Sequence, residues 1–347
     1  MIVKLTNSKE TIDITQLIPD ISNSGDYLQA VRTLNLSIVS SSTDKDIPSI
    51  NVELGNVIQL FHADNELFYG YVFKRIKATD SKSIDLYCYD CGIYLKKNKY
   101  SYKFRNITPE DITRKICSDY QIEIGSIAST GVKINKNYIG LDLYSIIIGS
   151  YYEASATTGK KYMIRFIGKK LNVIEKGDKS SAQILQSANN LLTSNVSESI
   201  ENMVNAVAVF DDNNNLLTKV KNDNNIKLYG LMQEHYKAGK DGKYKEKANS
   251  MLQDIERKIT VTNFGNIKCI TGNAAVVQEP YTGLYGLFYI DSDIHSWKNG
   301  IYTNKLVLNF QNLMDEKEVG ELPAASGSSA GNIQWTPESQ KPLTGGS

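Results

Sequence analysis

The sequence lacks the features of a secreted, disulfide-bonded or membrane-spanning protein. Its N-terminus, MIVKLTNSKE, contains no apolar stretch of signal-peptide length. The longest strongly apolar run lies near residues 143–152 and is too short to span a bilayer. Four cysteines in a chain of 347 residues do not suggest a disulfide framework. We therefore expect a protein that is made and kept soluble in a cytoplasm, with no membrane partner.

The net charge is also small, and arginine is scarce. The formal net charge is +1, so no global electrostatic field favours nucleic acid or an acidic membrane as a partner. Only six of the 39 basic residues are arginines, which limits the bidentate contacts that phosphate and base recognition favour. Tyrosine is abundant instead, with 21 residues against nine phenylalanines. Tyrosine suits half-buried strands and interfaces, where one end of the ring is apolar and the other is wet.

The motifs of common hydrolases are missing too. The sequence contains neither GxSxG nor HExxH, and TGKKY at 158–162 lacks the upstream glycine of a phosphate-binding loop. In YIDSDIHSWKNG, His295 could serve as a base with Asp291 or Asp293. No nucleophile can be named beside it, and a structural role suits a lone histidine at a strand end better. We expect no enzymatic activity, no catalytic residues and no cofactor.

Alternating hydrophobicity predicts a mainly β protein. In TLNLSIV at 33–39, apolar and polar residues alternate with the period of a half-buried strand. Similar patterns cover the first hundred residues and return from about Ser197. In this later region we expect strands over 203–210, 216–221, 226–236, 258–264, 266–272, 273–278, 285–291 and 301–310. Series of short strands separated by turn residues suggest a small sandwich or barrel in each region.

An α/β pattern separates the two strand-rich regions. A helix is predicted over 108–120, because Thr108 can cap it and Pro109 suits its first position. A second helix is predicted over 141–155, followed by a hairpin over 161–177. One more amphipathic helix is predicted over 243–257, inside the second strand-rich region.

These patterns divide the chain into four parts. We expect a first β-barrel at 1–106, an α/β insertion at 107–190, and a second β-barrel with one helix at 191–314. Residues 315–347 form a C-terminal tail whose last part, from 322, is rich in Pro, Gly and Ser. We expect residues 315–347 to be extended or flexible, and residues 322–347 to pack, if at all, only on a partner.

Cys88 and Cys91 form a CxxC pair in YCYDCGIYLKK. A zinc site would need a second pair or histidines at matching spacing, and the other cysteines and histidines are scattered. A thioredoxin-like redox site would need the pair to open a helix after a strand, and residues 92–100 lack convincing helical order. Cys88 fits the alternation of its strand. Both cysteines are interpreted as small buried hydrophobic residues, and they remain weak metal candidates.

The stretch KKNKYSYKFR at 96–105 interleaves basic and aromatic residues. Such a strand can stack nucleic-acid bases and follow phosphates. It is equally a plain amphipathic strand, with the aromatic residues on one face and a solvated basic face that discourages edge pairing. The near-zero net charge favours the second interpretation.

Several stretches, taken in order, resemble the baseplate hub family of contractile phage tails and phage-tail-like particles, including defective prophages of Gram-positive bacteria. The chain is similar in this respect to the hub of T-even phage tails. The likeness covers most of residues 1–312. Cys91 stands where a proline or an apolar residue is expected, and the tail after 312 matches no part of the family. The stretches are ELFYGYVF (66–73), YDCGIYLKKNKYSYKF (89–104), ITRKICSDYQIEIGSIASTGVKI (112–134), GKKYMIRFIGKKLNVIEKG (159–177), KLYGLMQEHY (227–236) and IDSDIHSWKNGIYTNKLVL (290–308).

The resemblance implies a structural baseplate hub, with two tail-tube-like barrels in one chain. Three such chains would form a ring of pseudo-sixfold symmetry that joins a hexameric tail tube to a trimeric central spike. The implied partners are the spike, the tail tube or tube-initiator proteins and the baseplate wedge proteins, with DNA only in transit through the channel. The implied location is a virion or a tail-like bacteriocin, assembled in the bacterial cytoplasm.

Two functions from other classes stay open as alternatives. A tail-associated cell-wall hydrolase would need a convergent acid and nucleophile, which the sequence does not display. A receptor- or glycan-binding module is compatible with exposed aromatic residues. The sequence does not identify the residues of any partner interface.

Overall fold

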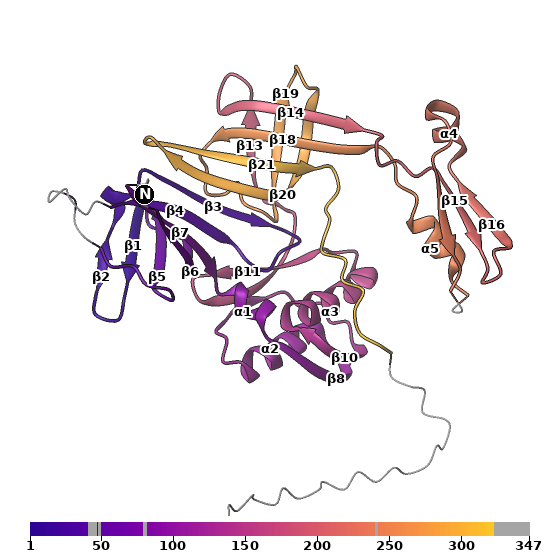
Figure 1. The fold of residues 1–347 in the computed structure, drawn as a ribbon, viewed down its shortest axis with the longest axis horizontal. Coiled ribbons are helices and arrows are strands. Elements are labelled where there is room, and N and C mark those ends of the chain that lie inside the picture. The colour runs from indigo at the N-terminus through magenta and orange to yellow at the C-terminus, as the bar shows by residue number, and fades with distance from the viewer. Residues whose placement is uncertain (41–46, 48–49, 79–81, 240–241, 323–347) are drawn as a thin grey trace, which may run out of the picture.

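The computed structural model describes residues 1–40, 47, 50–78, 82–239 and 242–322 (Figure 1). The protein is mainly β, as the sequence predicts, and its largest sheet has 13 strands. Over the described residues the strand order of this sheet is open, so closure into two barrels stays a proposal.

The first strand-rich part is built on alternating side chains. In β4, Leu34, Leu36 and Ile38 are buried and the residues between them are less so, which confirms the predicted alternation. These side chains pack into one core with Trp297, which comes from a distant strand. The elements are β1 (Ile2–Thr6), β2 (Thr11–Asp13), η1 (Thr15–Leu17), β3 (Asp20–Asp26), β4 (Thr33–Val39), β5 (Val57–His62), β6 (Asn65–Lys77) and β7 (Ser83–Asp90).

The α/β part follows directly. The predicted helix at 108–120 is confirmed as α2, and the Thr108 hydroxyl accepts a hydrogen bond from the Asp111 backbone N–H at its start. The second predicted helix is confirmed as α3, and the hairpin as β11 and β12. The elements are α1 (Gly92–Lys97), β8 (Lys99–Ile107), α2 (Pro109–Asp119), β9 (Ile124–Ile127), β10 (Ile134–Asp142), α3 (Leu143–Thr158), β11 (Tyr162–Ile167) and β12 (Lys170–Glu175).

The second strand-rich part has a core of its own but shares a sheet with the first. Its long strand β20 pairs with β19 through one half and with β3 through the other, at Ser292 to Lys298. The thirteen-stranded sheet therefore runs without interruption from one part into the other. The elements are β13 (Asp178–Gln186), β14 (Leu191–Ser199), β18 (Glu256–Phe264), β19 (Asn273–Glu279), β20 (Leu284–Lys298) and β21 (Ile301–Asn309).

A small lobe is inserted between β14 and β18 and stands to one side of the molecule (Figure 1). Its three-stranded sheet has the order β16-β15-β17, and α5 packs against it over a separate small core. The elements are β15 (Ala206–Phe210), β16 (Leu216–Lys221), α4 (Asp223–Tyr229), β17 (Gln233–Lys237) and α5 (Tyr244–Ser250).

Several local predictions in this half are wrong. Strands begin at Asp178, before the predicted return at Ser197, because β13 and β14 carry polar residues that hide their period. The strand predicted over 226–236 is helical in its first part, since the Asn222 side chain caps α4. The strand predicted over 266–272 is a series of turns, where the Asn266 side chain accepts a hydrogen bond from the Lys268 backbone N–H. The helix predicted over 243–257 ends at Ser250.

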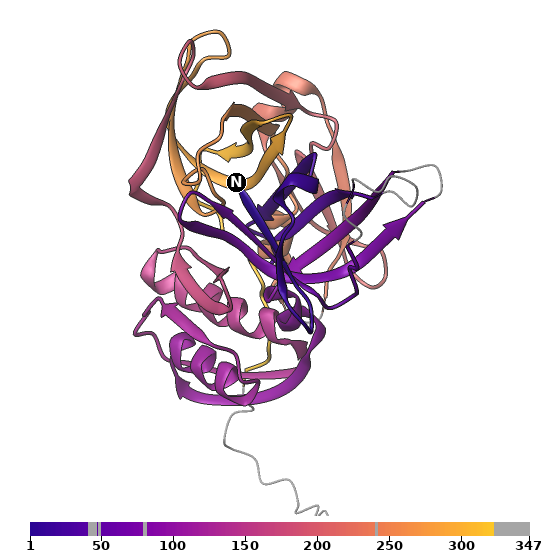
Figure 2. The same cartoon turned by 90° about the vertical axis from the view of Figure 1, so that its left-hand side faces the viewer.

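After β21 the chain returns to the α/β part as an extended segment (Figures 1 and 2). The Tyr144 hydroxyl donates a hydrogen bond of 2.8 Å to the Asp315 carboxylate, and Glu321 forms an isolated β-bridge with Asn137. Val319 lies against Gly149, where a Cβ atom would come within 2.4 Å of it. The beginning of the predicted tail therefore packs on its own chain, and residues 323–347 lie outside the described residues.

Candidate functional site

The two cysteines of the CxxC pair lie in different environments. Cys88 is fully buried in β7, where it pairs with Leu34 of β4 and Val72 of β6. Cys91 is the residue immediately before α1. The sequence analysis did not predict this helix, which covers residues 92–97. Gly92 permits this turn, because a Cβ atom there would meet the Ala30 carbonyl oxygen at 2.1 Å.

The thiol chemistry does not favour a redox or metal site. Burial raises the pKa of Cys88 far above its ordinary value and that of Cys91 to about 11, so both remain protonated thiols at neutral pH. Across the described residues, no group of three or more His, Cys, Asp or Glu side chains lies close enough together to hold a metal ion. Cys91 lacks the second and third ligands that a zinc site requires.

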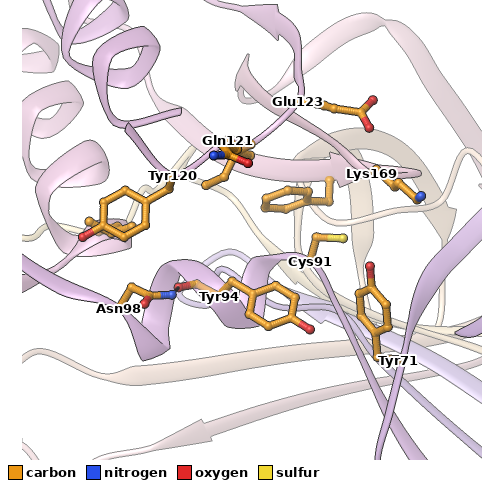
Figure 3. Close-up of a pocket in the computed structure, with 11 residues that line it drawn as sticks. Tyr71, Cys91, Tyr94, Asn98, Tyr120, Gln121, Glu123 and Lys169 are labelled. Atoms are coloured by element: carbon orange, nitrogen blue, oxygen red, sulfur yellow. Dashed lines mark hydrogen bonds between the residues drawn. The ribbon is translucent and has the colours of Figure 1, made fainter. Parts of the chain in front are cut away.

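Cys91 lines a pocket of about 320 Å³ between the first strand-rich part and the α/β part. Its sulfur points toward the space between Tyr71 and Lys169 (Figure 3). Tyr71 and Tyr94 pack edge to face, with ring centroids 5.9 Å apart. The pocket is small and aromatic, and it could enclose one side chain or one ring. The complete lining is Tyr71, Cys91, Tyr94, Asn98, Tyr120, Gln121, Ile122, Glu123, Leu143, Phe166 and Lys169.

We expect Cys91 to be the one slowly reactive thiol of the native chain, because Cys88, Cys117 and Cys269 are buried. A thiol-reactive dye at pH 7.5 should label one cysteine per chain, and Cys91→Ser should abolish that labelling. The raised pKa predicts a labelling rate that climbs with pH toward about 11. Cys117→Ser is the matched control and should leave the labelling unchanged. Fast labelling at neutral pH, or a stoichiometric zinc adduct in native mass spectrometry, would contradict this description.

His295 lies in a buried polar junction between the two strand-rich parts. Its Nδ1 atom is 2.7 Å from the Tyr302 hydroxyl and 2.9 Å from the Asn304 side-chain nitrogen, and its Nε2 atom is 3.3 Å from Asp293. Asp293 is fully buried, and Asp291 pairs with Lys176 instead. Of the two carboxylates considered as partners of His295, Asp293 is the one that lies beside it, within a buried polar network.

The centre of this junction is the ion pair of Asp293 with Arg32, a partner that the sequence analysis did not single out. Arg32 donates two hydrogen bonds to the Asp293 carboxylate, at 2.9 and 2.5 Å. The Thr271 backbone N–H and hydroxyl also donate to this carboxylate. Burial alone would raise the pKa of Asp293, but the Arg32 charge and these hydrogen bonds hold it well below its ordinary value. No local signal connects Arg32 with Asp293, which lies 261 residues further along the chain.

The basic stretch at 96–105 forms the end of α1 and most of β8. Tyr102 and Phe104 are 6% and 4% exposed, whereas Tyr100 is 53% exposed. The aromatic face that could have stacked bases is thus mostly covered by the α/β core. The interpretation as an amphipathic strand with a solvated basic face is confirmed.

Comparison with known proteins identifies similar chains. The YQBQ-like family model matches residues 21–309. The chain is 26% identical over 327 residues to "Phage-like element PBSX protein XkdQ" of Bacillus subtilis (strain 168), covering 90% of this chain and 99% of that protein. It is 24% identical over 315 residues to "Uncharacterized protein YqbQ" of the same organism, covering 87% of this chain and 94% of that protein.

Solved structures share the fold at low sequence identity. The 43 kDa tail protein of prophage MuSo2 from Shewanella oneidensis has a TM-score of 0.67 at 10% identity, with 93% of this chain and 100% of that chain covered. A tail protein from Neisseria meningitidis MC58 has a TM-score of 0.60 at 12% identity, with coverages of 91% and 98%. The E. coli c3393 protein, described as a type VI secretion component with structural similarity to T4 tail proteins gp27 and gp5, has a TM-score of 0.53 at 10% identity, with coverages of 93% and 79%.

Proposed function

Because the chain belongs to the YQBQ-like family and is similar to a phage-like element protein and to prophage tail proteins, we propose that it is the trimeric baseplate hub of a contractile tail or tail-like bacteriocin. The resemblance to baseplate hubs is confirmed at the level of family and fold. In the proposed role, the hub joins a hexameric tail tube to a trimeric central spike, and it contacts baseplate wedge proteins around its rim.

The continuous sheet across β3 and β20 is the observation that carries this proposal. Two strand-rich parts with separate cores are joined edge to edge, as neighbouring subunits of a ring would be. We propose that each part is an opened tube-like barrel, within the divisions 1–106, 107–190, 191–314 and 315–347. Three chains would then present six similar units to a sixfold tube and a threefold axis to the spike.

Native mass spectrometry of the purified chain over a concentration series tests the proposal. We expect a species with the mass of three 38.7 kDa chains, in exchange with monomers at low concentration. Co-expression with the spike from the same gene cluster should increase the trimer population. A chain that stays monomeric both alone and with the spike would overturn the trimeric hub.

We propose a scaffold role in preference to catalysis or glycan binding. The relatives are named as phage-like-element and tail proteins, which supports a structural role. In the described residues, no helix is long and apolar enough to cross a membrane. A peptidoglycan zymogram and a glycan array test the two alternatives directly. We propose that the particle assembles in the bacterial cytoplasm.

A further inference from the structure

The sheet formed by β8 and β10 has one covered face and one open face. Tyr102 and Phe104 of β8 and Tyr138 of β10 belong to the core beneath α2 and α3. The Tyr102 hydroxyl donates a hydrogen bond to Asp119 of α2, which fixes this face against the helix. What β8 and β10 offer to a partner is therefore the opposite face and the outer edge of the sheet.

The open face is basic. Lys99, Lys103 and Arg105 of β8 are all exposed and alternate along the strand with the buried aromatic residues. The Arg105 guanidinium donates hydrogen bonds of 2.8 Å to the Asn137 side chain and 2.7 Å to the Phe104 carbonyl, which holds it over the sheet. Neither strand carries a carboxylate until Asp142, the last residue of β10, which caps α3. For a chain with a net charge of +1, this is a marked local excess of positive charge.

The outer edge of β8 is unpaired in the part of the chain that the structure describes, where β8 pairs with β10 and with no other strand. Such an edge presents a row of backbone N–H and C=O groups that can pair with an added strand.

The other edge of the same sheet already accepts an acidic extended segment. Asn137 of β10 and Glu321 exchange two backbone hydrogen bonds of 2.8 Å. The segment that leads there, DEKEVGE at 315–321, has four carboxylates and one lysine. A single β-bridge at Glu321 thus joins the end of an acidic segment of the same chain to this sheet.

We propose that the outer edge and basic face of β8 bind an acidic, extended polypeptide segment of a partner protein by strand addition. The backbone edge supplies the main-chain hydrogen bonds, and Lys103 and Arg105 select glutamate or aspartate at alternate positions of the added strand. A polypeptide is favoured over nucleic acid because Tyr102 and Phe104 are not available to stack on bases. This site does not depend on trimer formation, so it goes beyond the proposed function.

The test uses the full chain and a fluorescein-labelled ten-residue peptide that alternates glutamate with valine and threonine. Fluorescence anisotropy should show binding that weakens with added salt. Lys103→Glu combined with Arg105→Glu should weaken binding about tenfold or more, because two attractive charges are removed and two repulsive charges replace them. Amide hydrogen exchange with bound peptide should slow within residues 99–107.

The matched control reverses two exposed lysines on other strands or turns, Lys9→Glu with Lys305→Glu, and should bind the peptide as the unmodified chain does. A peptide with lysine in place of glutamate should not bind. The proposal is overturned if the glutamate peptide binds no tighter than about 1 mM, if both double variants bind alike, or if protection falls outside β8. It is equally overturned if a ten-nucleotide single-stranded DNA binds this site more tightly than the glutamate peptide.

Discussion

Replacing Asp293 by alanine is expected to lower the free energy of unfolding by about 3–5 kcal/mol, because it leaves the buried Arg32 guanidinium without a counter-charge. Asp293 is fully buried and accepts hydrogen bonds from Arg32 and Thr271. The variant should open the contact between β3 and β20, where the two strand-rich parts meet. Urea unfolding followed by Trp297 fluorescence, in a Trp335→Phe background, measures the loss.

Two controls separate the charge from the shape at this site. Asp293→Asn preserves the shape but removes the charge, and should be nearly as destabilised as the alanine variant. The double change Arg32→Met with Asp293→Leu removes both charges and should recover most of the loss. A loss below about 1 kcal/mol for the alanine variant would show that the pair contributes no more than a surface ion pair.

The pH dependence of this effect follows from the direction of the pKa shift. The folded-state pKa of Asp293 is lowered, so its contribution is present above the ordinary carboxyl pKa and is lost as the pH falls through the lowered value. The difference between the unmodified chain and Asp293→Ala should therefore persist down to about pH 4.

Replacing Asp90 by asparagine is expected to change the free energy of unfolding in a pH-dependent way. The gain of the variant over the unmodified chain should be larger at alkaline pH than at acidic pH. Burial raises the pKa of Asp90 to about 7, although Arg32 and hydrogen bonds to backbone N–H groups, including that of Gly92, oppose the shift. A carboxyl with a raised folded-state pKa contributes stability that is fully present below its unfolded pKa and is lost as the pH rises through about 7. Between pH 4 and pH 8 the unmodified chain should lose up to about 4 kcal/mol relative to the variant.

Asparagine suits this test because its side-chain oxygen can still accept the 2.9 Å hydrogen bond from the Gly92 N–H. Urea unfolding of both chains at several pH values gives the two stability curves. Asp85→Asn, which changes a half-buried carboxylate on the same strand, is the matched control. Parallel stability curves for the unmodified chain and Asp90→Asn would show that burial does not raise the pKa of Asp90.

Local features were predictable because their causes lie within a few residues. The Thr108 cap and Pro109 define the start of α2, and the alternation of Leu34, Leu36 and Ile38 defines β4. The failures have equally local reasons. Residues 92–97 form a helix because Gly92 fits against Ala30, a contact that sequence pattern cannot reveal.

The resemblance to baseplate hubs was also readable from the sequence, since it rests on the order of short motifs along the chain. The family match and the Bacillus subtilis relative support it, and solved tail proteins share the fold at 10–12% identity. The site could not be read in the same way. The CxxC pair can be recognised in the sequence by its spacing, whereas Arg32 and Asp293 belong to no sequence motif.

Periodicity and capping act over a turn or a strand, so they specify the strand-rich class, the α/β segment with its capped helices, and the amphipathic character of β8. Long-range packing alone establishes that β3 pairs with β20, that Arg32 meets Asp293, and that the residues up to Glu321 return to β10. Such contacts join residues far apart in the chain. Their energy depends on burial and on the exclusion of water, which exist only once the whole fold has formed.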